Sequence, residues 1–309
     1  MNILIAGAAG FIGTNLALAL IADPANTVTL ADAKLEYFTC PLLQENPNVH
    51  LKQMDVKNND FDLLVAQQDI VFHLVSTTNP SSSNNHIEAE LDDNIAFSTR
   101  LLEACVAQDV KKVIFISSGG TVYGNAACPI SEDASTNPIS AYGIQKLTIE
   151  KIFQLYHYLH GIDYNIIRLA NPYGPYQRPN GKLGALTTFT YKAIHNEPIH
   201  VYGDGSVVRD YIYIGDAVDA IIKISLGTPQ HHLYNVGSGM GTSINDLLQL
   251  LRDTLDVDVP VVYESRRSVD LAQNYLDIHR YENEYGSLVS TTLSEGIRKT
   301  ADFLRSHSY

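Results

Sequence analysis

Residues 2–13 read NILIAGAAGFIG, and they decide the fold that we expect for this chain. An apolar run over residues 2–6 ends in three glycines spaced three residues apart, and an apolar segment with helical spacing follows over residues 14–21. The pattern predicts a strand, a tight turn and a helix. In such a turn the first glycine permits the bend, the second lets backbone N–H groups approach a pyrophosphate, and the third lets helix and strand pack closely.

A second predicted strand, residues 27–31, is followed by Asp32, roughly twenty residues after the glycines. A carboxylate at that place can accept hydrogen bonds from the ribose hydroxyls of NAD, and it would repel the 2′-phosphate of NADP. The glycine turn and Asp32 together therefore predict an NAD site. The alternative is an ordinary strand-to-helix turn followed by an Asp that caps a helix.

Further strands and helices alternate along the chain. Runs of strand length occur at 49–53, 70–74, 113–116 and 164–169, with helical patterns at about 87–108 and 141–160 between the later ones. Alternation predicts the α/β class, as a Rossmann-like, doubly wound parallel sheet that binds ligands outside the carboxyl ends of its strands. Small or polar segments follow three strands, as this rule requires: Asp55-Val56, Val75-Ser76-Thr77 and Ser117-Ser118-Gly119-Gly120-Thr121.

The sequence changes character from Asn171 onwards. Residues 171–181 are rich in turn formers and Tyr, which indicates a loop that enters a smaller second region. Residues 207–225 again read as strand and helix, so we expect this region to be interleaved with the first. Helical patterns recur near 243–255 and 292–305.

Tyr142 and Lys146 form a candidate catalytic pair in the segment Tyr142-Gly143-Ile144-Gln145-Lys146. Positions four apart share one face of a helix, so a phenol and an ammonium there can serve the same reacting atom. A nearby positive charge favours the phenolate, so we expect the pKa of Tyr142 to be lowered and Tyr142 to act as a general base. The alternative for a Tyr and a Lys at this spacing is a solvated helix face.

Composition narrows the possible partners. The chain has 309 residues and a formal charge of −13, which disfavours nucleic acid and anionic membranes, because both are bound by clustered Lys and Arg. The three cysteines, Cys40, Cys105 and Cys128, lack a metal-ligand spacing, and reduced thiols in a cytoplasmic protein are the simplest account. We see no signal peptide and no apolar run long enough for a membrane span, and we expect no metal site.

The order of these motifs resembles that of the short-chain dehydrogenase/reductases, and within them the extended branch of NAD-dependent nucleotide-sugar epimerases and dehydratases. The resemblance covers nearly the whole chain. Its segments are Gly7, Gly10 and Gly13, Asp55-Val56, Phe72-His73-Leu74-Val75 (a variant of His-Leu-Ala-Ala), Asn94, Leu101-Leu102-Glu103-Ala104, and residues 168–175 (RLANPYGP), 201–205 (VYGDG), 209–213 (RDYIY), 234–239 (YNVGSG) and 293–297 (LSEGI).

The resemblance implies roles for individual residues. Tyr142 would be the acid/base, and Lys146 would hold the nicotinamide ribose. NAD would be bound by Gly7, Gly10, Phe11, Ile12, Gly13, Asp32, Asp55, Val56, Leu74, Val75, Ser76, Asn94, Ser117, Tyr142 and Lys146. The substrate would be bound by Asn171, Tyr202, Arg209, Arg267, Asp270 and Asn274. We therefore expect an NAD-binding domain at 1–170, which also receives segments from about 204–232, and a nucleotide-sugar-binding region at 171–203 and 233–309.

The implied activity is epimerisation at carbon 4 of a UDP-hexose. Dehydratases of this branch carry Asp-Glu after the catalytic hydroxyl, and the decarboxylases keep a Glu, but residues 118–124 (SGGTVYG) hold no carboxylate. Asp32 disfavours the NADPH-dependent reductases. Conversion at another ring position, or of a GDP, CDP or dTDP sugar, remains an alternative.

One position departs from the family pattern. The second catalytic hydroxyl of many members falls at Gly119, so we expect it to come from Thr121 or Ser118. If no hydroxyl reaches the sugar, the alternative is a catalytically silent NAD-binding sensor.

The resemblance also bears on the sugar pocket and on assembly. Asn274 occupies the gating position, where a Tyr would exclude N-acetyl sugars; a one-residue shift of the alignment would place Tyr275 there instead. The helical patterns at about 87–108 and 141–160 are apolar on more than one face, and in the family these helices pair across a two-fold axis. We expect a homodimer; the alternative is that the second face packs against the chain's own second region.

Overall fold

The computed structural model describes residues 1–57, 60–77, 83–85, 87–179, 184–265 and 271–307. The chain divides into two compact units. Unit 1 comprises residues 1–122, 138–168 and 221–234, and unit 2 comprises residues 123–137, 169–220 and 235–309.

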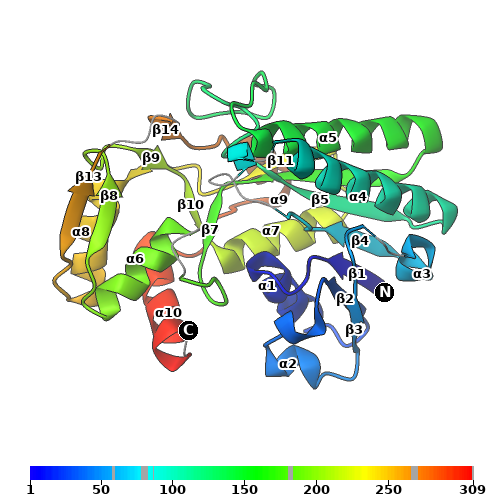
Figure 1. Cartoon of the computed structure of the whole chain (residues 1–309), viewed down its shortest axis with the longest axis horizontal. Coiled ribbons are helices and arrows are strands. Elements are labelled where there is room, and N and C mark those ends of the chain that lie inside the picture. The colour runs from blue at the N-terminus through cyan, green and yellow to red at the C-terminus, as the bar shows by residue number, and fades with distance from the viewer. Residues whose placement is uncertain (58–59, 78–82, 86, 180–183, 266–270, 308–309) are drawn as a thin grey trace. The chain divides into compact units, whose positions relative to one another are not determined.

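A seven-stranded parallel sheet forms the centre of unit 1 (Figure 1). Its strands are β1 (Asn2–Ala6), β2 (Thr27–Asp32), β3 (Val49–Gln53), β4 (Ile70–His73), β5 (Lys112–Ser118), β6 (Asp163–Leu169) and β11 (Leu233–Val236). Their order is β11-β6-β5-β4-β1-β2-β3, so the direction of the crossovers reverses between β1 and β4. This reversal is the switch point of a doubly wound sheet, and the predicted fold class is confirmed.

Helices flank the sheet on both sides. They are α1 (Phe11–Leu20), α2 (Pro41–Gln44), α3 (Phe61–Val65), α4 (Ile87–Ala107), α5 (Ala141–His160) and α7 (Ile214–Leu226), with short 3₁₀ turns η1 (Leu35–Tyr37) and η2 (Ser83–Asn85). Figure 1 shows α4 and α5 side by side, and α3 packs beside α4. Because parallel crossovers are right-handed and the winding reverses at β1, α1 covers the opposite face of the sheet from α4 and α5.

The register of the central strands aligns their carboxyl ends. Ala6 of β1 pairs with Ala31 of β2 on one side and with His73 of β4 on the other. The residues that follow, Gly7, Asp32 and Leu74, are therefore brought to one edge of the sheet.

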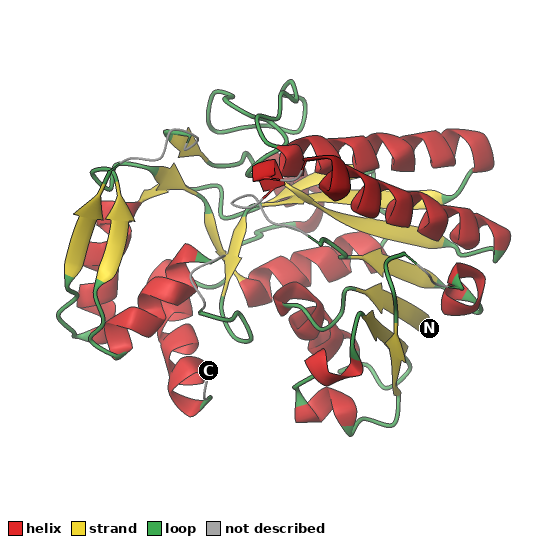
Figure 2. Ribbon diagram, in the orientation of Figure 1, coloured by secondary structure: helices red, strands yellow, loops and turns green. Residues whose placement is uncertain are grey.

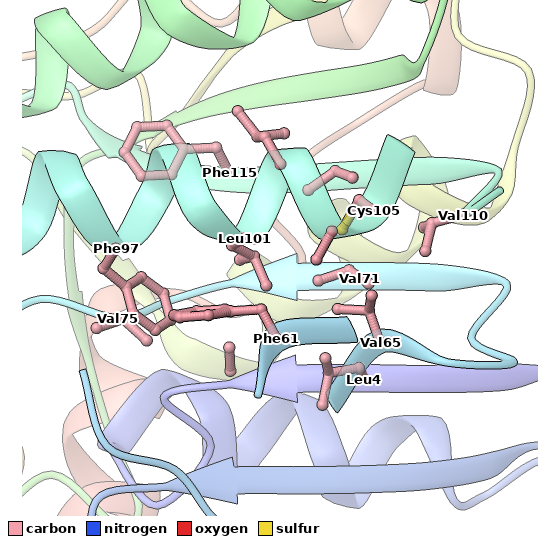
Figure 3. Close-up of a cluster of buried hydrophobic side chains, with 14 of the residues drawn as sticks. Leu4, Phe61, Val65, Val71, Val75, Phe97, Leu101, Cys105, Val110 and Phe115 are labelled. Atoms are coloured by element: carbon pink, nitrogen blue, oxygen red, sulfur yellow. The ribbon is translucent and has the colours of Figure 1, made fainter. Parts of the chain in front are cut away.

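The main core of unit 1 lies between the sheet and helices α3, α4 and α5 (Figure 3). Leu4, Val71 and Phe115 of the sheet are completely buried in it. Phe61 of α3 meets Phe97 of α4 edge to face, with ring centres 5.4 Å apart. Such aromatic pairs add to the burial of apolar area that holds helices on a sheet.

Helix α5 begins and ends at the predicted residues. The Ser140 side chain accepts a hydrogen bond from Gly143 N at 3.1 Å, which is a helix N-cap. At the other end Gly161 adopts a left-handed φ of 72°, and its N–H donates to the carbonyl of His157. Local sequence signals are therefore sufficient to set both ends of this helix.

Unit 2 contains short strands and further helices (Figure 2). Its strands are β7 (Asn171–Tyr173), β8 (Ile199–Tyr202), β9 (Val208–Arg209), β10 (Tyr211–Tyr213), β12 (Thr242–Ser243), β13 (Val261–Glu264) and β14 (Gln273–Asn274). They form the small sheets β10-β7, β12-β9-β14 and β13-β8. The helices are α6 (Ala185–Ile194), α8 (Ile244–Leu255), α9 (His279–Tyr285) and α10 (Leu293–Ser306), of which α6, α8 and α10 pack on one another.

The predicted loop at residues 171–181 is wrong at its start, because residues 171–173 form β7. This strand pairs with β10 in parallel, Asn171 opposite Tyr211. A three-residue strand that contains Pro172 has no readable periodicity, so only its distant partner reveals it.

The compact units and the predicted domains differ at two segments. Residues 123–137 lie in unit 2, although we expected them in the first domain, and residues 204–220 also lie in unit 2 rather than in the first domain. Residues 221–234 lie in unit 1. Helix α7 thus begins in one unit and ends in the other.

We predict that Gly13→Ala destabilises the protein by about 1–3 kcal/mol. A Cβ at position 13 would lie 2.6 Å from both Cα and O of Ala8, where the backbone has no room to move. Gly10→Ala is the matched control, since its nearest contact is Gly7 O at 3.5 Å. Urea denaturation of both variants measures the difference, and equal midpoints would contradict close packing at Gly13.

Candidate active site

The glycine turn joins β1 to α1 and is held by backbone hydrogen bonds. The N–H groups of Gly7 and Ala8 donate to Ala31 O at 2.9 and 3.1 Å. Gly7 has φ 87°, and a Cβ there would lie 2.9 Å from the backbone of Leu74 and Val75. A side chain at Gly7 would therefore push β4 away from the turn.

Helix α1 offers an anion site at its start. Its N-cap is Gly10, and no side chain of the described residues caps it. The first N–H groups of a helix have no partners within the helix, and the helix dipole favours a negative charge beside them. The turn therefore fits the pyrophosphate of a dinucleotide. Helix α1 begins at Phe11, earlier than the predicted residue 14, so Phe11 and Ile12, for which we predict contacts with NAD, lie in its first turn.

Asp32 ends β2 and braces the same turn. Its carboxylate accepts hydrogen bonds from Ala9 N at 2.9 Å and from Ala33 N at 2.8 Å. The carboxylate of Asp32 therefore lies beside the turn that leads into α1. This arrangement fits the ribose of NAD and is unfavourable for a further phosphate on it.

Four further residues that we predicted to contact NAD follow strands β3 and β4: Asp55, Val56, Leu74 and Val75. Val56 packs against the main core and lines a cavity of about 550 Å³ together with Leu91 and Ile95. Asp55 is exposed and accepts a hydrogen bond from Lys57 N at 2.8 Å. Val75 is buried and Leu74 is partly buried. These side chains fit contacts to a base better than contacts to phosphate.

Asn94 makes two side-chain hydrogen bonds with Thr77. Its Oδ1 accepts a hydrogen bond from Thr77 N at 3.0 Å, and its Nδ2 donates to Thr77 Oγ1 at 2.7 Å. Asn94 is buried on α4, so the pair fastens the segment after β4 to that helix. The predicted contact of Asn94 with NAD remains a prediction.

Tyr142 and Lys146 lie on the first turns of α5. Lys146 is buried, and its Nζ donates to Ile116 O at 3.0 Å. The same Nζ lies 4.7 Å from the ring centre of Phe115 and 5.6 Å from that of Tyr142. Gly143 lets the first turn of α5 lie close to the loop after β5, because a Cβ there would be 2.7 Å from Thr121 O.

The expected lowering of the pKa of Tyr142 is not found. Burial raises the pKa of Tyr142 to about 12, and a hydrogen bond from Ser76 opposes this shift. Burial also lowers the pKa of Lys146 to about 8, against the favourable charge of Glu150. The physical reason is that loss of water around both groups outweighs an ammonium that is hydrogen-bonded to Ile116 O and 5.6 Å from the ring.

A buried ion pair supports α5 one turn further on. Arg168 Nε and Nη2 donate to the two carboxylate oxygens of Glu150 at 3.0 and 2.6 Å. The Ser117 hydroxyl donates to Glu150 Oε1 at 2.5 Å, so in this structure it is engaged with Glu150. Sequence reasoning missed Glu150, although its position four residues after Lys146 on one helix face was a usable signal.

The hydroxyl that replaces the one missing at Gly119 was predicted to come from Thr121 or Ser118. Thr121 Oγ1 is buried and has no hydrogen-bond partner among the described residues. Ser76, which follows β4, is the side chain that opposes the rise in the pKa of Tyr142. We had predicted Ser76 only as a contact of the cofactor, because no sequence pattern connects residues 76 and 142.

Two predicted substrate residues are adjacent in unit 2. Arg209 of β9 pairs with Asn274 of β14, and its Nη1 donates to Leu271 O at 2.9 Å. Asn274 is buried, whereas its neighbour Tyr275 is partly exposed and packs near Gly241.

The remaining predicted substrate residues lie on other strands or outside the described part. Asn171 Nδ2 donates to Asp210 O at 2.8 Å. Tyr202 is 38% exposed on β8, in a different small sheet from Arg209. Arg267 and Asp270 lie outside the described residues.

Three further features bear on ligand classes. Within the described residues, no cluster of His, Cys, Asp or Glu side chains has the arrangement of a metal site. The same part of the chain has no helix with the length and apolar character needed to span a membrane. Cys40, Cys105 and Cys128 are free thiols.

Comparison with known proteins identifies the family. Residues 3–237 match the model of the NAD dependent epimerase/dehydratase family. The chain belongs to this family. Its cofactor is NAD, which agrees with the glycine turn and Asp32.

Similar proteins match this family member over their full lengths. The UDP-glucose 4-epimerase of Mycolicibacterium smegmatis is 32% identical over 100% of both chains. The structure of the Thermotoga maritima UDP-glucose 4-epimerase with UDP-glucose superposes with a TM-score of 0.91, at 31% identity and 99% coverage of both chains. The UDP-N-acetylglucosamine 4-epimerase of Methanobrevibacter ruminantium, in complex with UDP-N-acetylmuramic acid, gives a TM-score of 0.90 at 30% identity, covering 99% of this chain and 98% of that one.

Proposed function

We propose that this chain is a nucleotide-sugar epimerase that acts at carbon 4, with UDP-glucose and UDP-galactose as its substrates. The observation that carries the proposal is the Tyr142 phenol on α5, whose ring centre lies 5.6 Å from the buried ammonium of Lys146. Residues 117–124 hold no carboxylate, so the loop after β5 lacks the acid and base that elimination of water requires.

The residues of unit 1 then have distinct tasks. Tyr142 takes the proton of the sugar 4-hydroxyl and later returns a proton to the 4-keto sugar. Lys146 keeps a positive charge beside the phenol, where it stabilises the phenolate. Bound NAD supplies the hydride acceptor and donor, so that one cofactor serves every turnover.

Unit 2 supplies the residues that we assign to the substrate. Arg209 and Asn171 would bind the diphosphate, since two phosphates need charge-assisted hydrogen bonds and Arg offers several donors. Arg267 and Asp270 belong to the same proposal. Tyr202 is exposed enough to contact a nucleobase. A firm hold on the nucleotide and a loose hold on the sugar would let the keto sugar present its other face.

We also propose that the sugar pocket admits N-acetyl sugars through Asn274. This side chain is smaller than the Tyr that would exclude an acetamido group, and its pairing with Arg209 puts it next to a residue assigned to the substrate. The similarity to a UDP-N-acetylglucosamine 4-epimerase supports this proposal.

Mass spectrometry of the ligands released on denaturation is the most direct test. The purified protein should release NAD, and it should interconvert UDP-glucose and UDP-galactose, or their N-acetyl forms, without added cofactor. Release of NADP, or stoichiometric consumption of NADPH, would point to a reductase. Turnover of only a GDP, CDP or dTDP sugar, or conversion at another ring position, would retain the family chemistry and reject the proposed substrate.

We further propose that the chain is a homodimer that associates through α5. Ile144, Leu155 and Leu159 of this helix are 45%, 50% and 57% exposed. Their spacing places them on one side of α5, away from Tyr142. Exposed apolar stripes of this kind are typical of protein interfaces.

Leu155→Lys should convert the dimer into monomers. The change puts a charge into the proposed apolar interface, and a buried unpaired charge opposes association strongly. Light scattering coupled to size exclusion measures the mass of the particle, and Gln154→Lys on the neighbouring exposed position is the control. If the wild-type protein elutes as a monomer at high concentration, the proposed homodimer is wrong.

A further inference from the structure

We infer that Asp210 is a positioning residue for the nucleotide, because it holds in place the segments of unit 2 that we assign to the substrate. The inference rests on the proposed function, since it takes Asn171 and Arg209 as the residues that bind the diphosphate. Asp210 itself does not contact the substrate. It acts through the residues that its carbonyl group and its side chain hold.

The carbonyl group of Asp210 holds Asn171. The backbone N–H and the side-chain Nδ2 of Asn171 both donate to Asp210 O, at 3.1 and 2.8 Å. Only the NH₂ end of an amide can donate, so this bond fixes which way the side chain faces. Strand β7 begins at Asn171 and pairs with Tyr211 of β10, the residue directly after Asp210. Asn171 is therefore held in both position and orientation.

The carboxylate of Asp210 holds two further segments that are distant in the sequence. Its Oδ1 accepts hydrogen bonds from the N–H of Ser238 at 2.7 Å and from the Ser238 hydroxyl at 2.6 Å. Its Oδ2 accepts a hydrogen bond from Leu276 N at 3.2 Å. Ser238 follows β11, and Leu276 lies two residues after Asn274, our candidate for the sugar pocket. One side chain thus joins the start of β10 to the segments that follow β11 and β14.

Arg209 is attached to the same segment around β14. Its Nη1 donates to Leu271 O at 2.9 Å, and Arg209 pairs with Asn274. Asp210 binds Leu276, on the other side of Asn274 in the chain. The guanidinium and the carboxylate therefore fix this segment at two points, before and after Asn274. A change at Asp210 that frees Leu276 would also loosen the segment on which Arg209 is placed.

The surroundings of the Asp210 carboxylate are specific to it. Asp210 is completely buried, and a Cβ at Gly237 would lie 2.4 Å from its Oδ2. Within the described part of the chain, its charge is compensated by hydrogen bonds and by no Lys or Arg side chain. Burial raises the pKa of this carboxyl group, and the bonds from Ser238 and Leu276 oppose the shift. A buried carboxylate without a cation is costly, which fits a group that serves to position other residues.

Asp210→Asn tests the inference in the full-length protein with its NAD bound. The amide has nearly the same volume but only one accepting oxygen, so the bonds from Ser238 and Leu276 cannot both be kept. We expect the Kd for UDP, measured by calorimetry, and the KM for UDP-glucose to rise by roughly 10- to 100-fold, since an unsatisfied buried group has about this effect. The kcat and the NAD content should change little. Asp258→Asn, the same change at an exposed carboxyl group of unit 2, should bind UDP as the wild type does.

Ser238→Ala is a milder variant that tests the inference even if Asp210→Asn does not fold. It removes one hydrogen bond to Oδ1 and leaves the carboxylate and its other two bonds in place. The Kd for UDP should rise by roughly 3- to 10-fold, as expected for the loss of one hydrogen bond. Ser287→Ala, at an exposed serine of unit 2, is the control. If Ser238→Ala binds UDP as tightly as the wild type, the inference is wrong.

The outcomes separate this inference from the proposed function. A lower urea midpoint of Asp210→Asn with an unchanged Kd for UDP would mean that Asp210 only stabilises the fold, which rejects the inference. A lower kcat with an unchanged KM would reject it as well. If the wild type binds UDP but does not convert UDP-glucose, the proposed function fails, while the UDP titrations still test Asp210. If the wild type binds none of UDP, GDP, CDP and dTDP, both are wrong.

Discussion

Tyr142→Phe is expected to lower the epimerisation rate by roughly 10³- to 10⁴-fold while the protein still binds NAD. The change removes one oxygen and leaves the ring in place, so α5 and the glycine turn should be unaffected. A positioned proton-transfer group contributes about 10²- to 10⁴-fold to a rate. We place this loss at the upper end, because no carboxylate in residues 117–124 can take over the task. Formation of UDP-galactose from UDP-glucose gives the rate, and absorbance after denaturation gives the NAD content.

Tyr158→Phe is the matched control for this experiment. Tyr158 lies on the same helix and is 84% exposed, so the same chemical change should leave the rate unaltered. Wild-type turnover by Tyr142→Phe would exclude Tyr142 as the acid/base. Absence of turnover in the wild type, with NAD bound normally, would favour the catalytically silent sensor.

Lys146→Met should lower the rate by roughly 10²- to 10³-fold without destabilising the fold. Removal of one preorganised group that stabilises developing charge has this magnitude in other enzymes. The buried ammonium costs desolvation energy, and Met fills a similar volume without it, so denaturation midpoints should not fall. Glu150 keeps its partner Arg168 in the variant. A large loss of stability would mean that Lys146 is mainly a structural residue.

The pH dependence of Lys146 has opposite signs for activity and for stability. Its pKa is lowered by burial from 10.5 to about 8, so the ammonium is present below pH 8 and is lost above it. Activity should therefore decline as pH rises through 8. Between pH 8 and 10.5 the unfolded chain holds a proton that the native state has released, so the contribution of this group to stability rises with pH.

The variant Lys146→Arg distinguishes the titration of Lys146 from the titration of other groups that could affect activity. A guanidinium stays charged beyond pH 12, so the decline above pH 8 should disappear in this variant even if altered geometry lowers the rate. Profiles of kcat/KM from pH 6 to 10 measure the effect. A wild-type profile that stays flat over this range would contradict a titrating Lys146.

Much of the fold was predictable because its signals are local. The strands at 2–6, 27–31 and 49–53 and the helix at 141–160 follow from apolar periodicity, glycines and caps, and the structure confirms them. The short strands of unit 2 were not predictable. Strands β9 and β14 have two residues each and are defined only by pairing with segments distant in the sequence, β14 with β9 and β9 also with β12.

The candidate site likewise has a part that was predictable from the sequence and a part that was not. Tyr142 and Lys146 are four residues apart on one helix, and a spacing of this kind is visible in the chain itself. The partner of Lys146 was not visible, because Ile116 lies on β5 and its carbonyl meets Nζ of Lys146 only when α5 packs on this strand. The pKa values also escaped prediction: their main cause is burial, which depends on the packing of the whole unit.

The sequence by itself determined the nucleotide-binding architecture, since the glycine turn, Asp32 and the helix with Tyr142 and Lys146 depend on backbone conformation and helical spacing. Only the tertiary structure decided how these groups work together. It placed the ammonium of Lys146 against Ile116 O, engaged Ser117 with Glu150, and joined Asn94 to Thr77. These contacts join residues from 17 to 33 positions apart in the chain, which no local pattern encodes.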